Sequence, residues 1–95
     1  MALVFEWNPA KAKANLSKHG VSFEEAASVF ADPMARIFPD QSHSANEHRE
    51  LIVGHSREST LLVVSFIERT ASVRVISARR ATRRERRDYE ENVGP

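Results

Sequence analysis

The chain of 95 residues contains no cysteine. It can therefore form no disulfide, no thiolate metal site and no cysteine nucleophile. No uninterrupted run of hydrophobic residues approaches the roughly 20 that cross a membrane. The N-terminus reaches Glu6 before any stretch of signal-peptide length. These absences predict a soluble protein of the cytoplasm that makes no membrane contact.

The length of the chain limits the number of domains. A chain of this size buries roughly two thirds of its unfolded surface, which suffices for a hydrophobic core without metal ions or disulfides. We therefore expect residues 1–95 to form a single domain.

Charge is distributed unevenly along the chain. Residues 1–67 carry six basic and eight acidic side chains, whereas residues 68–95 carry eight basic and five acidic ones. All eight basic residues of the second segment are arginines. Because the guanidinium group matches phosphate with a planar fork of donors, this segment predicts a nucleic acid or an acidic protein as partner.

Two helices are predicted in the N-terminal part. Asn8 can cap the first helix, and Pro9 suits its first position. Gly20 is a typical stop directly after it. Residues 22–25 have the pattern of a capping box, and the hydrophobic residues that follow have the spacing of one buried helix face. The second helix is expected to end at Asp32.

Five strands and a final helix complete the predicted domain. The strands are expected over residues 4–7, 34–38, 50–55, 60–68 and 72–78. A second capping box, residues 82–85, begins a basic helix that runs to about Asn92. This order predicts an α+β fold in which two N-terminal helices pack on one face of a mostly antiparallel sheet. A lone glycine within a strand, Gly54, indicates a bulge or a close backbone approach.

Polar side chains gather around the last predicted hairpin and strand. They are Glu68, Arg69, Arg74, Ser77 and Arg79. Cleavage of RNA without a metal ion needs an acceptor for the 2′-hydroxyl proton and cations for the charged phosphorane, and arginines can supply the cations. The spacing alone favours a simpler alternative, in which Glu68, Arg69 and Arg74 form cross-strand ion pairs on a solvated face.

Arginines also crowd the turn into the last helix and its first turns. They are Arg79, Arg80, Arg83, Arg84, Arg86 and Arg87, with Glu85 as the single acid among them. Their mutual repulsion favours a polyanionic or acidic partner over simple solvation. At this level, contact with nucleic acid and contact with a protein are equally supported.

The four histidines offer a possible general base, because imidazole titrates near neutral pH. No two have the helical spacing of a metal-binding pair, so a metal site is not expected. His19 follows Lys18 at a helix C-terminus, where a cation is stabilised by the helix dipole. His43 lies in a polar loop and is the better functional candidate. Trp7 and Tyr89 are candidates for base stacking, although a single tryptophan beside a strand is more often part of the core.

Several stretches, taken in order, resemble one family over nearly the whole chain. They are residues 5–9 with Lys11, residues 15–26, Asp40, His43, Ser44, Glu47, Arg49, Gly54, Glu68, Arg69, residues 74–82, Glu85 and Tyr89. The KHGVSFEEA stretch and the ISARRAT stretch at this separation are specific in combination, and they resemble the BrnT toxins.

This resemblance implies a RelE-like fold and a type II toxin that cuts RNA and arrests growth, with no cofactor. It also implies a cognate antitoxin that blocks the toxin, and a complex of the two that binds operator DNA through the antitoxin. The implied phosphate-holding residues are Arg69, Arg74, Ser77 and Arg79, with Glu68 or His43 as proton acceptor. RNA contacts are expected from Lys18, His19, Arg49, Arg80, Arg83, Arg84 and Arg87.

A second function class stays open on the sequence alone. The chain could be a non-catalytic module that binds nucleic acid or an antitoxin, or a degenerate toxin that folds but does not cut. Such a module would show salt-sensitive RNA binding without cleavage.

Overall fold

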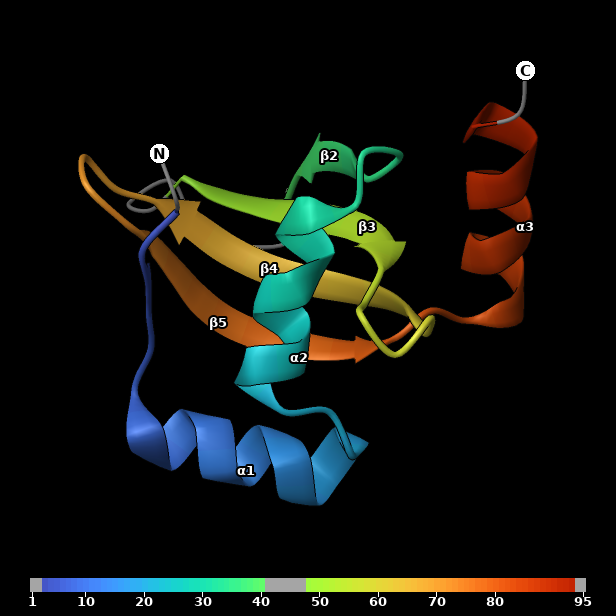
Figure 1. Ribbon diagram of the computed structural model, residues 1–95. Helices are drawn as coiled ribbons and strands as arrows, with labels where there is room; N and C mark the ends of the chain where they lie inside the picture. The colour runs from blue at the N-terminus through green and yellow to red at the C-terminus, as the bar shows by residue number, and fades with distance from the viewer. Residues whose placement is uncertain (1–2, 41–47, 94–95) are drawn as a thin grey trace.

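The computed structural model describes residues 3–40 and 48–93. They form three α-helices, a 3₁₀ turn and five strands (Figure 1). In chain order these are β1 (Phe5–Glu6), α1 (Pro9–His19), α2 (Phe23–Ser28), η1 (Val29–Ala31), β2 (Arg36–Pro39), β3 (Arg49–His55), β4 (Leu61–Glu68), β5 (Val73–Arg80) and α3 (Arg83–Val93).

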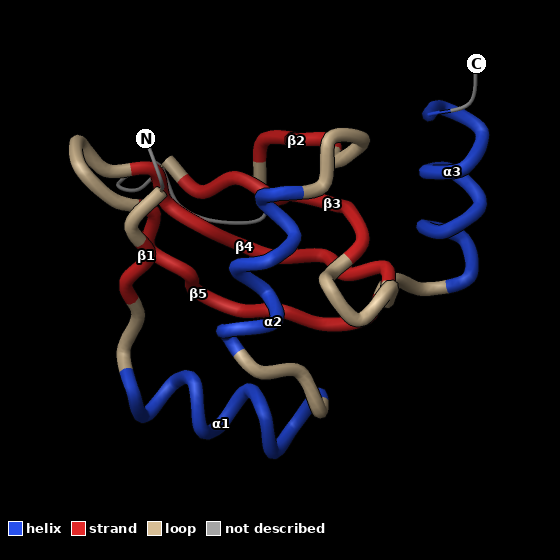
Figure 2. Tube along the Cα trace, viewed as in Figure 1, coloured by secondary structure: helices blue, strands red, loops and turns tan. Residues whose placement is uncertain are grey.

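All five strands belong to one mixed sheet, in the order β1-β5-β4-β3-β2 (Figure 2). β1 is parallel to β5, and the other three pairings are antiparallel. The prediction of an α+β fold with a mostly antiparallel sheet is confirmed. β4 lies at the centre of the sheet, and its residues 61–66, all hydrophobic except Ser65, are buried.

The first helix begins and ends where the sequence predicts. The Asn8 side chain accepts hydrogen bonds from the backbone N–H groups of Ala10 and Lys11, at 2.8 and 3.1 Å. At the other end Gly20 adopts the left-handed conformation, with φ of 71°.

The second helix is shorter than predicted. The Ser22 hydroxyl accepts a hydrogen bond from the Glu25 N–H at 3.0 Å, which confirms its role as cap. The Glu25 carboxylate, however, accepts a hydrogen bond from Ser56 Oγ at 2.7 Å in the turn after β3. α2 ends at Ser28, and the chain then tightens into the 3₁₀ turn η1.

The hydrophobic core lies between the sheet and the first two helices. α1 and α2 both contact β5, and the core includes Phe23, Val29, Val64 and Val75, each at most 1% exposed. Trp7 packs edge-on against Phe23 with ring centroids 5.9 Å apart, so this tryptophan belongs to the core. The face of the sheet toward this core is called the core face below, and the opposite one the outer face.

Gly54 allows the segment before β2 to approach β3 closely. A Cβ atom at this position would lie 2.8 Å from Cβ of Ala35 and 3.0 Å from Oδ2 of Asp32. The close approach that the lone glycine predicted is therefore present. It lets Asp32 accept a hydrogen bond from the His55 N–H at 2.7 Å.

Asn15 joins α1 to the edge of β5. β1 pairs with β5 only at Val73 and Arg74, so the rest of that edge has no strand beside it. The Asn15 amide donates to the Ala78 carbonyl at 2.8 Å, and its oxygen accepts from the Ala78 N–H at 3.1 Å. It also donates to the Val21 carbonyl at 2.9 Å. This buried side chain therefore replaces a neighbouring strand at one residue.

We predict that Asn15→Ala lowers the free energy of unfolding by about 3 kcal/mol, because it leaves buried backbone groups of Ala78 and Val21 without partners. Urea denaturation followed by circular dichroism measures this loss. Ser17→Ala, at an exposed position of the same helix, is the control and should change stability by less than about 0.5 kcal/mol. Equal effects of the two substitutions would contradict the role assigned to Asn15.

Candidate active site

A β-bulge in β5 decides which polar side chains share the outer face. Ser77 pairs with Ser65 and Val75 with Phe66, so Ile76 is an extra residue between them. In a regular strand, Arg74 and Arg79 would point to opposite faces, because side chains alternate. The bulge shifts this alternation by one residue. As a result, Arg74, Ser77 and Arg79 all lie on the outer face, while Val75 and Ala78 face the core.

The register extends this polar surface across the sheet. Arg49 of β3 and Arg74 of β5 both pair with Ile67 of β4, so the two arginines lie in one cross-strand row. In the next row, Ser65 and Ser77 are direct neighbours. Arg74, Ser77 and Arg79, three of the four residues expected to hold phosphate, thus share the outer face with Arg49, which was expected to contact RNA.

Arg74 and Arg69 are held by an acid that the sequence analysis did not consider. Arg74 donates to Glu6 Oε1 at 3.0 Å, and Arg69 Nε lies 3.9 Å from the same oxygen. Ser72 donates to Glu6 Oε2 at 2.6 Å. The Ser72 hydroxyl and then Arg74 lower the pKa of Glu6 below its ordinary value. The cross-strand ion pair is therefore formed by Glu6 of β1 instead of Glu68.

Arg79 of β5 forms an ion pair with Glu85 of α3. The two side chains make a bidentate contact with distances of 2.7 and 2.9 Å. Glu85 also accepts from the Thr82 N–H, and Thr82 Oγ1 accepts from the Glu85 N–H, so the predicted second capping box is complete. The hydrogen bonds from Arg79 lower the pKa of Glu85 to about 2, and Glu85 in turn raises the pKa of Arg79.

α3 is fixed to the rest of the fold by a few contacts. Among the described side chains of α3, that of Tyr89 is buried. The Tyr89 hydroxyl donates to the Met34 carbonyl at 3.2 Å. The Tyr89 ring packs edge-on against His55 with centroids 5.5 Å apart, so the predicted stacking candidate takes part in packing.

Asp32 lies next to this contact. Burial raises the pKa of the Asp32 carboxyl, but hydrogen bonds from the N–H groups of His55 and Met34 outweigh this effect, so the pKa is lower than its ordinary value.

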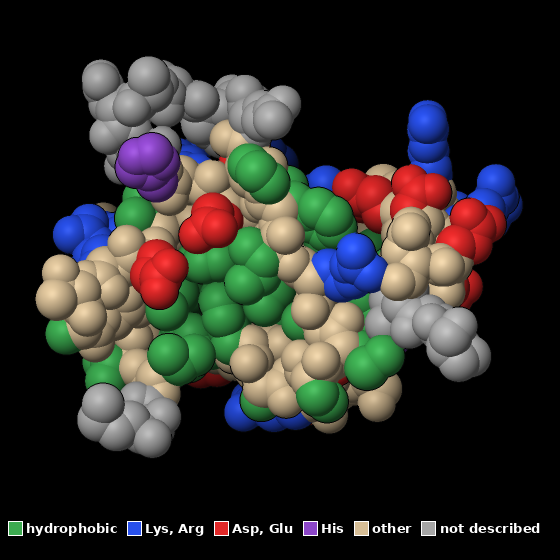
Figure 3. Space-filling model, turned by 90° about the horizontal axis from the view of Figure 1, so that it is seen from above, with side chains coloured by type: hydrophobic (Ala, Val, Ile, Leu, Met, Phe, Trp, Pro, Cys, Tyr) green, Lys and Arg blue, Asp and Glu red, His purple; other side chains and the backbone are tan. Residues whose placement is uncertain are grey.

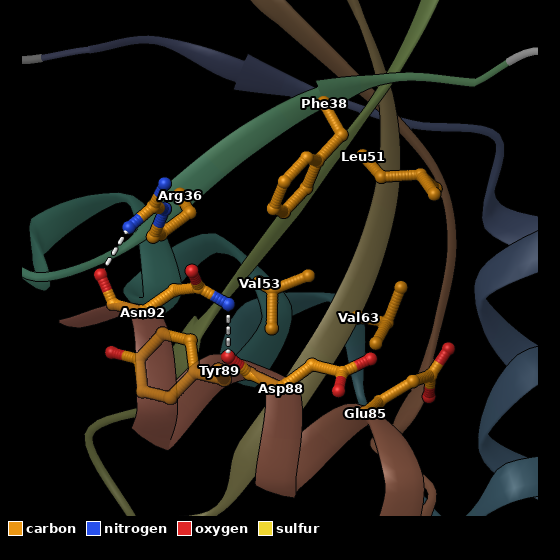
Figure 4. A pocket seen from close by; sticks show the side chains of 9 residues that line it. All are labelled: Arg36, Phe38, Leu51, Val53, Val63, Glu85, Asp88, Tyr89 and Asn92. Atoms are coloured by element: carbon orange, nitrogen blue, oxygen red, sulfur yellow. Dashed lines mark hydrogen bonds between the residues drawn. The ribbon is translucent and has the colours of Figure 1, made fainter.

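A cleft of about 430 Å³ separates α3 from the outer face of the sheet (Figure 4). Its lining residues are Arg36, Phe38, Leu51, Val53, Val63, Glu85, Asp88, Tyr89 and Asn92. At one end, the Arg36 guanidinium donates to the Asn92 carbonyl at 2.6 Å. Val63, in the floor of the cleft, pairs with Arg79 on the neighbouring strand. The cleft therefore begins one strand away from Arg79.

The predicted RNA-binding residues fall on different sides of the fold. The α3 arginines Arg83, Arg84 and Arg87 are exposed on the side of the helix away from the cleft, and Figure 3 shows charged side chains clustered over α3. Arg80 pairs with the core residue Leu62 and therefore lies on the core face. Lys18 and His19 end α1, which also covers that face.

Neither of the two predicted proton acceptors is seen beside Arg74 and Arg79 in the described part of the structure. Glu68 pairs with the core residue Val73, so it lies on the opposite face from Arg74. His43 lies outside the described residues. Besides Glu6, which is occupied by Arg74 and Ser72, Asp40 also reaches the outer face, where its Oδ2 lies 3.5 Å from Ser65 Oγ. The sequence indicated Asp40 only as one of the residues that carry the family resemblance, without a role in the reaction.

Within residues 3–40 and 48–93, no three His, Asp or Glu side chains are placed to hold a metal ion together. None of the described helices is long and apolar enough to cross a membrane.

We predict that Glu85→Gln destabilises the protein by about 1 kcal/mol at pH 7, since it removes the charge of a partly exposed pair while glutamine still completes the capping box. The lowered pKa of Glu85 makes its stabilisation fully present above about pH 4.5 and lost as the pH falls toward 2. Denaturant titrations of both proteins between pH 7 and pH 2.5 should therefore converge. A stability difference between wild type and Glu85→Gln that does not change with pH would contradict this prediction. So would an equal loss of stability in the control variant Glu90→Gln.

Comparison with known proteins supports one family. A search of curated proteins gives no match. The fold is similar to the 1.1 Å crystal structure of the Brucella abortus ribonuclease toxin BrnT, with a TM-score of 0.66 and 24% sequence identity. The alignment covers 86% of this chain and all of the Brucella chain.

The family comparison covers most of the sequence. Residues 7–85 match the family described as "Ribonuclease toxin, BrnT, of type II toxin-antitoxin system". This range contains α1, the whole sheet except β1, and the Arg79–Glu85 pair. The chain therefore belongs to the BrnT family of ribonuclease toxins of type II toxin-antitoxin systems.

Proposed function

We propose that this ribonuclease toxin, acting as a single domain with a RelE-like fold, cuts RNA on the outer face of its sheet without a metal ion. The observation that carries the proposal is the bulge at Ile76, which gathers Arg74, Ser77 and Arg79 on the face that α1 and α2 leave uncovered. Guanidinium groups placed in this way can stabilise a phosphorane by charge and hydrogen bonds alone.

The reaction is attack of a 2′-hydroxyl on the neighbouring phosphorus. The bond from O2′ to phosphorus forms and the bond from phosphorus to O5′ breaks, while the leaving O5′ takes a proton from water, which leaves a 2′,3′-cyclic phosphate and a 5′-hydroxyl. Arg74 and Arg79 contact the non-bridging oxygens, where negative charge increases in the transition state. Ser77 adds a donor from the next row of β5, and Arg49 adds one from β3, which β4 separates from β5. Arg69 lies in the turn between β4 and β5, beside Glu6.

The proton of the 2′-hydroxyl must pass to a base on the same face. Asp40 meets this condition, because its carboxylate lies beside Ser65 in the row of Ser77. The second candidate is His43, which follows Asp40 closely in the chain. Glu68 is excluded from this role in our proposal, because the sheet separates it from Arg74.

The α3 arginines extend the positive surface beyond the site of cleavage. Arg83, Arg84 and Arg87 form no ion pair with any residue of the described ranges. In our proposal they bind RNA phosphates along the helix, whereas Lys18, His19 and Arg80 do not touch the phosphate that is cut. As a type II toxin, the protein has a cognate antitoxin. We propose that the complex of the two acts in the cytoplasm and binds operator DNA through the antitoxin.

We predict that Arg74→Ala lowers the rate of RNA cleavage in EDTA at least about 100-fold, because one charged donor to the phosphorane is lost. A labelled RNA with its products resolved by size and end group measures this, and circular dichroism checks folding. Arg57→Ala is the matched control, since Arg57 is an exposed arginine of the turn after β3. If the wild type cuts only with divalent metal, metal independence is wrong. If it binds RNA but never cuts, the chain is a non-catalytic module or a degenerate toxin.

The α3 arginines should affect binding more than chemistry. We expect Arg83→Ala with Arg87→Ala to weaken RNA binding and to reduce the salt dependence of its affinity by about 0.7 per lost phosphate contact. The cleavage rate at saturating RNA should stay unchanged. Filter binding at several salt concentrations and single-turnover kinetics separate the two effects. If RNA binding is unchanged but antitoxin binding is weaker, these arginines bind the antitoxin and not RNA.

A further inference from the structure

The cleft between α3 and the sheet leaves open space that no side chain of the described residues fills. Its volume of about 430 Å³ lies within the range of roughly 300–1,000 Å³ that is typical of small-molecule sites. Leu51, Val53 and Val63 form an apolar floor between Phe38 on one side and α3 on the other (Figure 4). A flat apolar ligand would therefore be covered on two sides.

Phe38 supplies an exposed aromatic ring at this cleft. Its side chain is 44% exposed, although it pairs with Leu51 on the outer face of the sheet. An aromatic ring left accessible above an apolar floor is what base stacking in single-stranded RNA requires.

The wall formed by α3 carries a carboxylate without a partner. The Asp88 carboxylate has no hydrogen bond or ion pair with any residue of the described ranges, whereas Glu85 is occupied by Arg79. Asp88 is an acceptor with two oxygens side by side. Its natural ligand is therefore a group that presents two adjacent N–H donors.

The cleft is also close to the proposed phosphate site. Val63 pairs with Arg79, and Leu51 pairs with Ser65, which pairs in turn with Ser77. The floor of the cleft thus lies one to two strand spacings, roughly 5–10 Å, from Arg79 and Ser77. This separation suits a single nucleotide that spans from its phosphate to its base.

We infer that the cleft binds one nucleobase of the RNA substrate next to the cleaved phosphate, with Phe38 as stacking platform and Asp88 as the residue that selects guanine. Guanine fits this wall because its Watson–Crick edge places the N1–H and N2–H donors side by side, as one carboxylate can accept them. Cytosine and adenine offer one exocyclic amine there and uracil one ring N–H. The inference rests on the proposed cleavage site, but it concerns binding.

Methyl NMR of the full chain with nucleoside 3′-monophosphates tests the inference without turnover. We expect guanosine 3′-monophosphate to shift the methyl signals of Leu51, Val53 and Val63, and to bind about tenfold more tightly than the other three nucleotides. Asp88→Asn should abolish this preference. Phe38→Ala should lower the affinity for all four nucleotides about tenfold.

Two matched variants control for indirect effects. Glu90→Gln removes a carboxylate of α3 that does not line the cleft, and Ile37→Ala removes an exposed side chain of β2 that pairs with the core residue Ile52. Neither should change nucleotide binding.

Three outcomes would overturn the inference. They are the absence of methyl shifts at the cleft, equal affinities for all four nucleotides, and a Phe38→Ala variant that loses antitoxin but not nucleotide binding, which would make the cleft a protein-docking site. Cleavage in EDTA is judged separately by the Arg74→Ala experiment. A wild type that binds guanosine 3′-monophosphate at the cleft but needs metal to cut would retain the base site and refute the metal-free mechanism.

Discussion

The extra residue Ile76 determines the chemistry that this sheet can present. Without it, Arg74 would lie on one face of β5 and Ser77 with Arg79 on the other, and the core would lose either Val75 or Ala78. The bulge satisfies both requirements, because it lets hydrophobic residues face α1 and α2 on both sides of the shift. Asn15 supports the same stretch of β5 by bonding to both backbone groups of Ala78. Packing and the proposed cleavage site therefore depend on one local irregularity.

Acidic residues organise the arginines of the outer face. Glu6 holds Arg74 from β1, and Glu85 holds Arg79 from α3, so each guanidinium has a fixed orientation before RNA arrives. Such preorganisation lowers the cost of stabilising charge in a transition state. Glu85 has a second effect, because the capping box that it completes starts α3 and so fixes one wall of the cleft.

α3 connects the two parts of the proposed substrate site. One face of the helix carries Asp88 and Tyr89 toward the sheet, while Arg83 and Arg87 lie on the other. A nucleotide could thus contact the sheet through its phosphate and the inner face of α3 through its base. The helix is joined to the domain by few contacts, among them Tyr89 with Met34 and Arg36 with Asn92. Its position is therefore the part of the site that a bound partner can influence most.

The sequence by itself determined the elements, because caps, glycines and hydrophobic periodicity act over a few residues. Asn8, Gly20 and the 82–85 capping box lie where local rules place them. The sequence also indicated the family, and the resemblance to that family pointed to Arg74 and Arg79 as candidate site residues. Tertiary structure alone decided that Glu6 replaces Glu68 as the partner of Arg74, that Asn15 takes the place of a strand, and that a bulge unites Arg74 with Arg79. These features depend on register and on contacts between distant segments, and a change of one residue in register reverses every side chain of a strand.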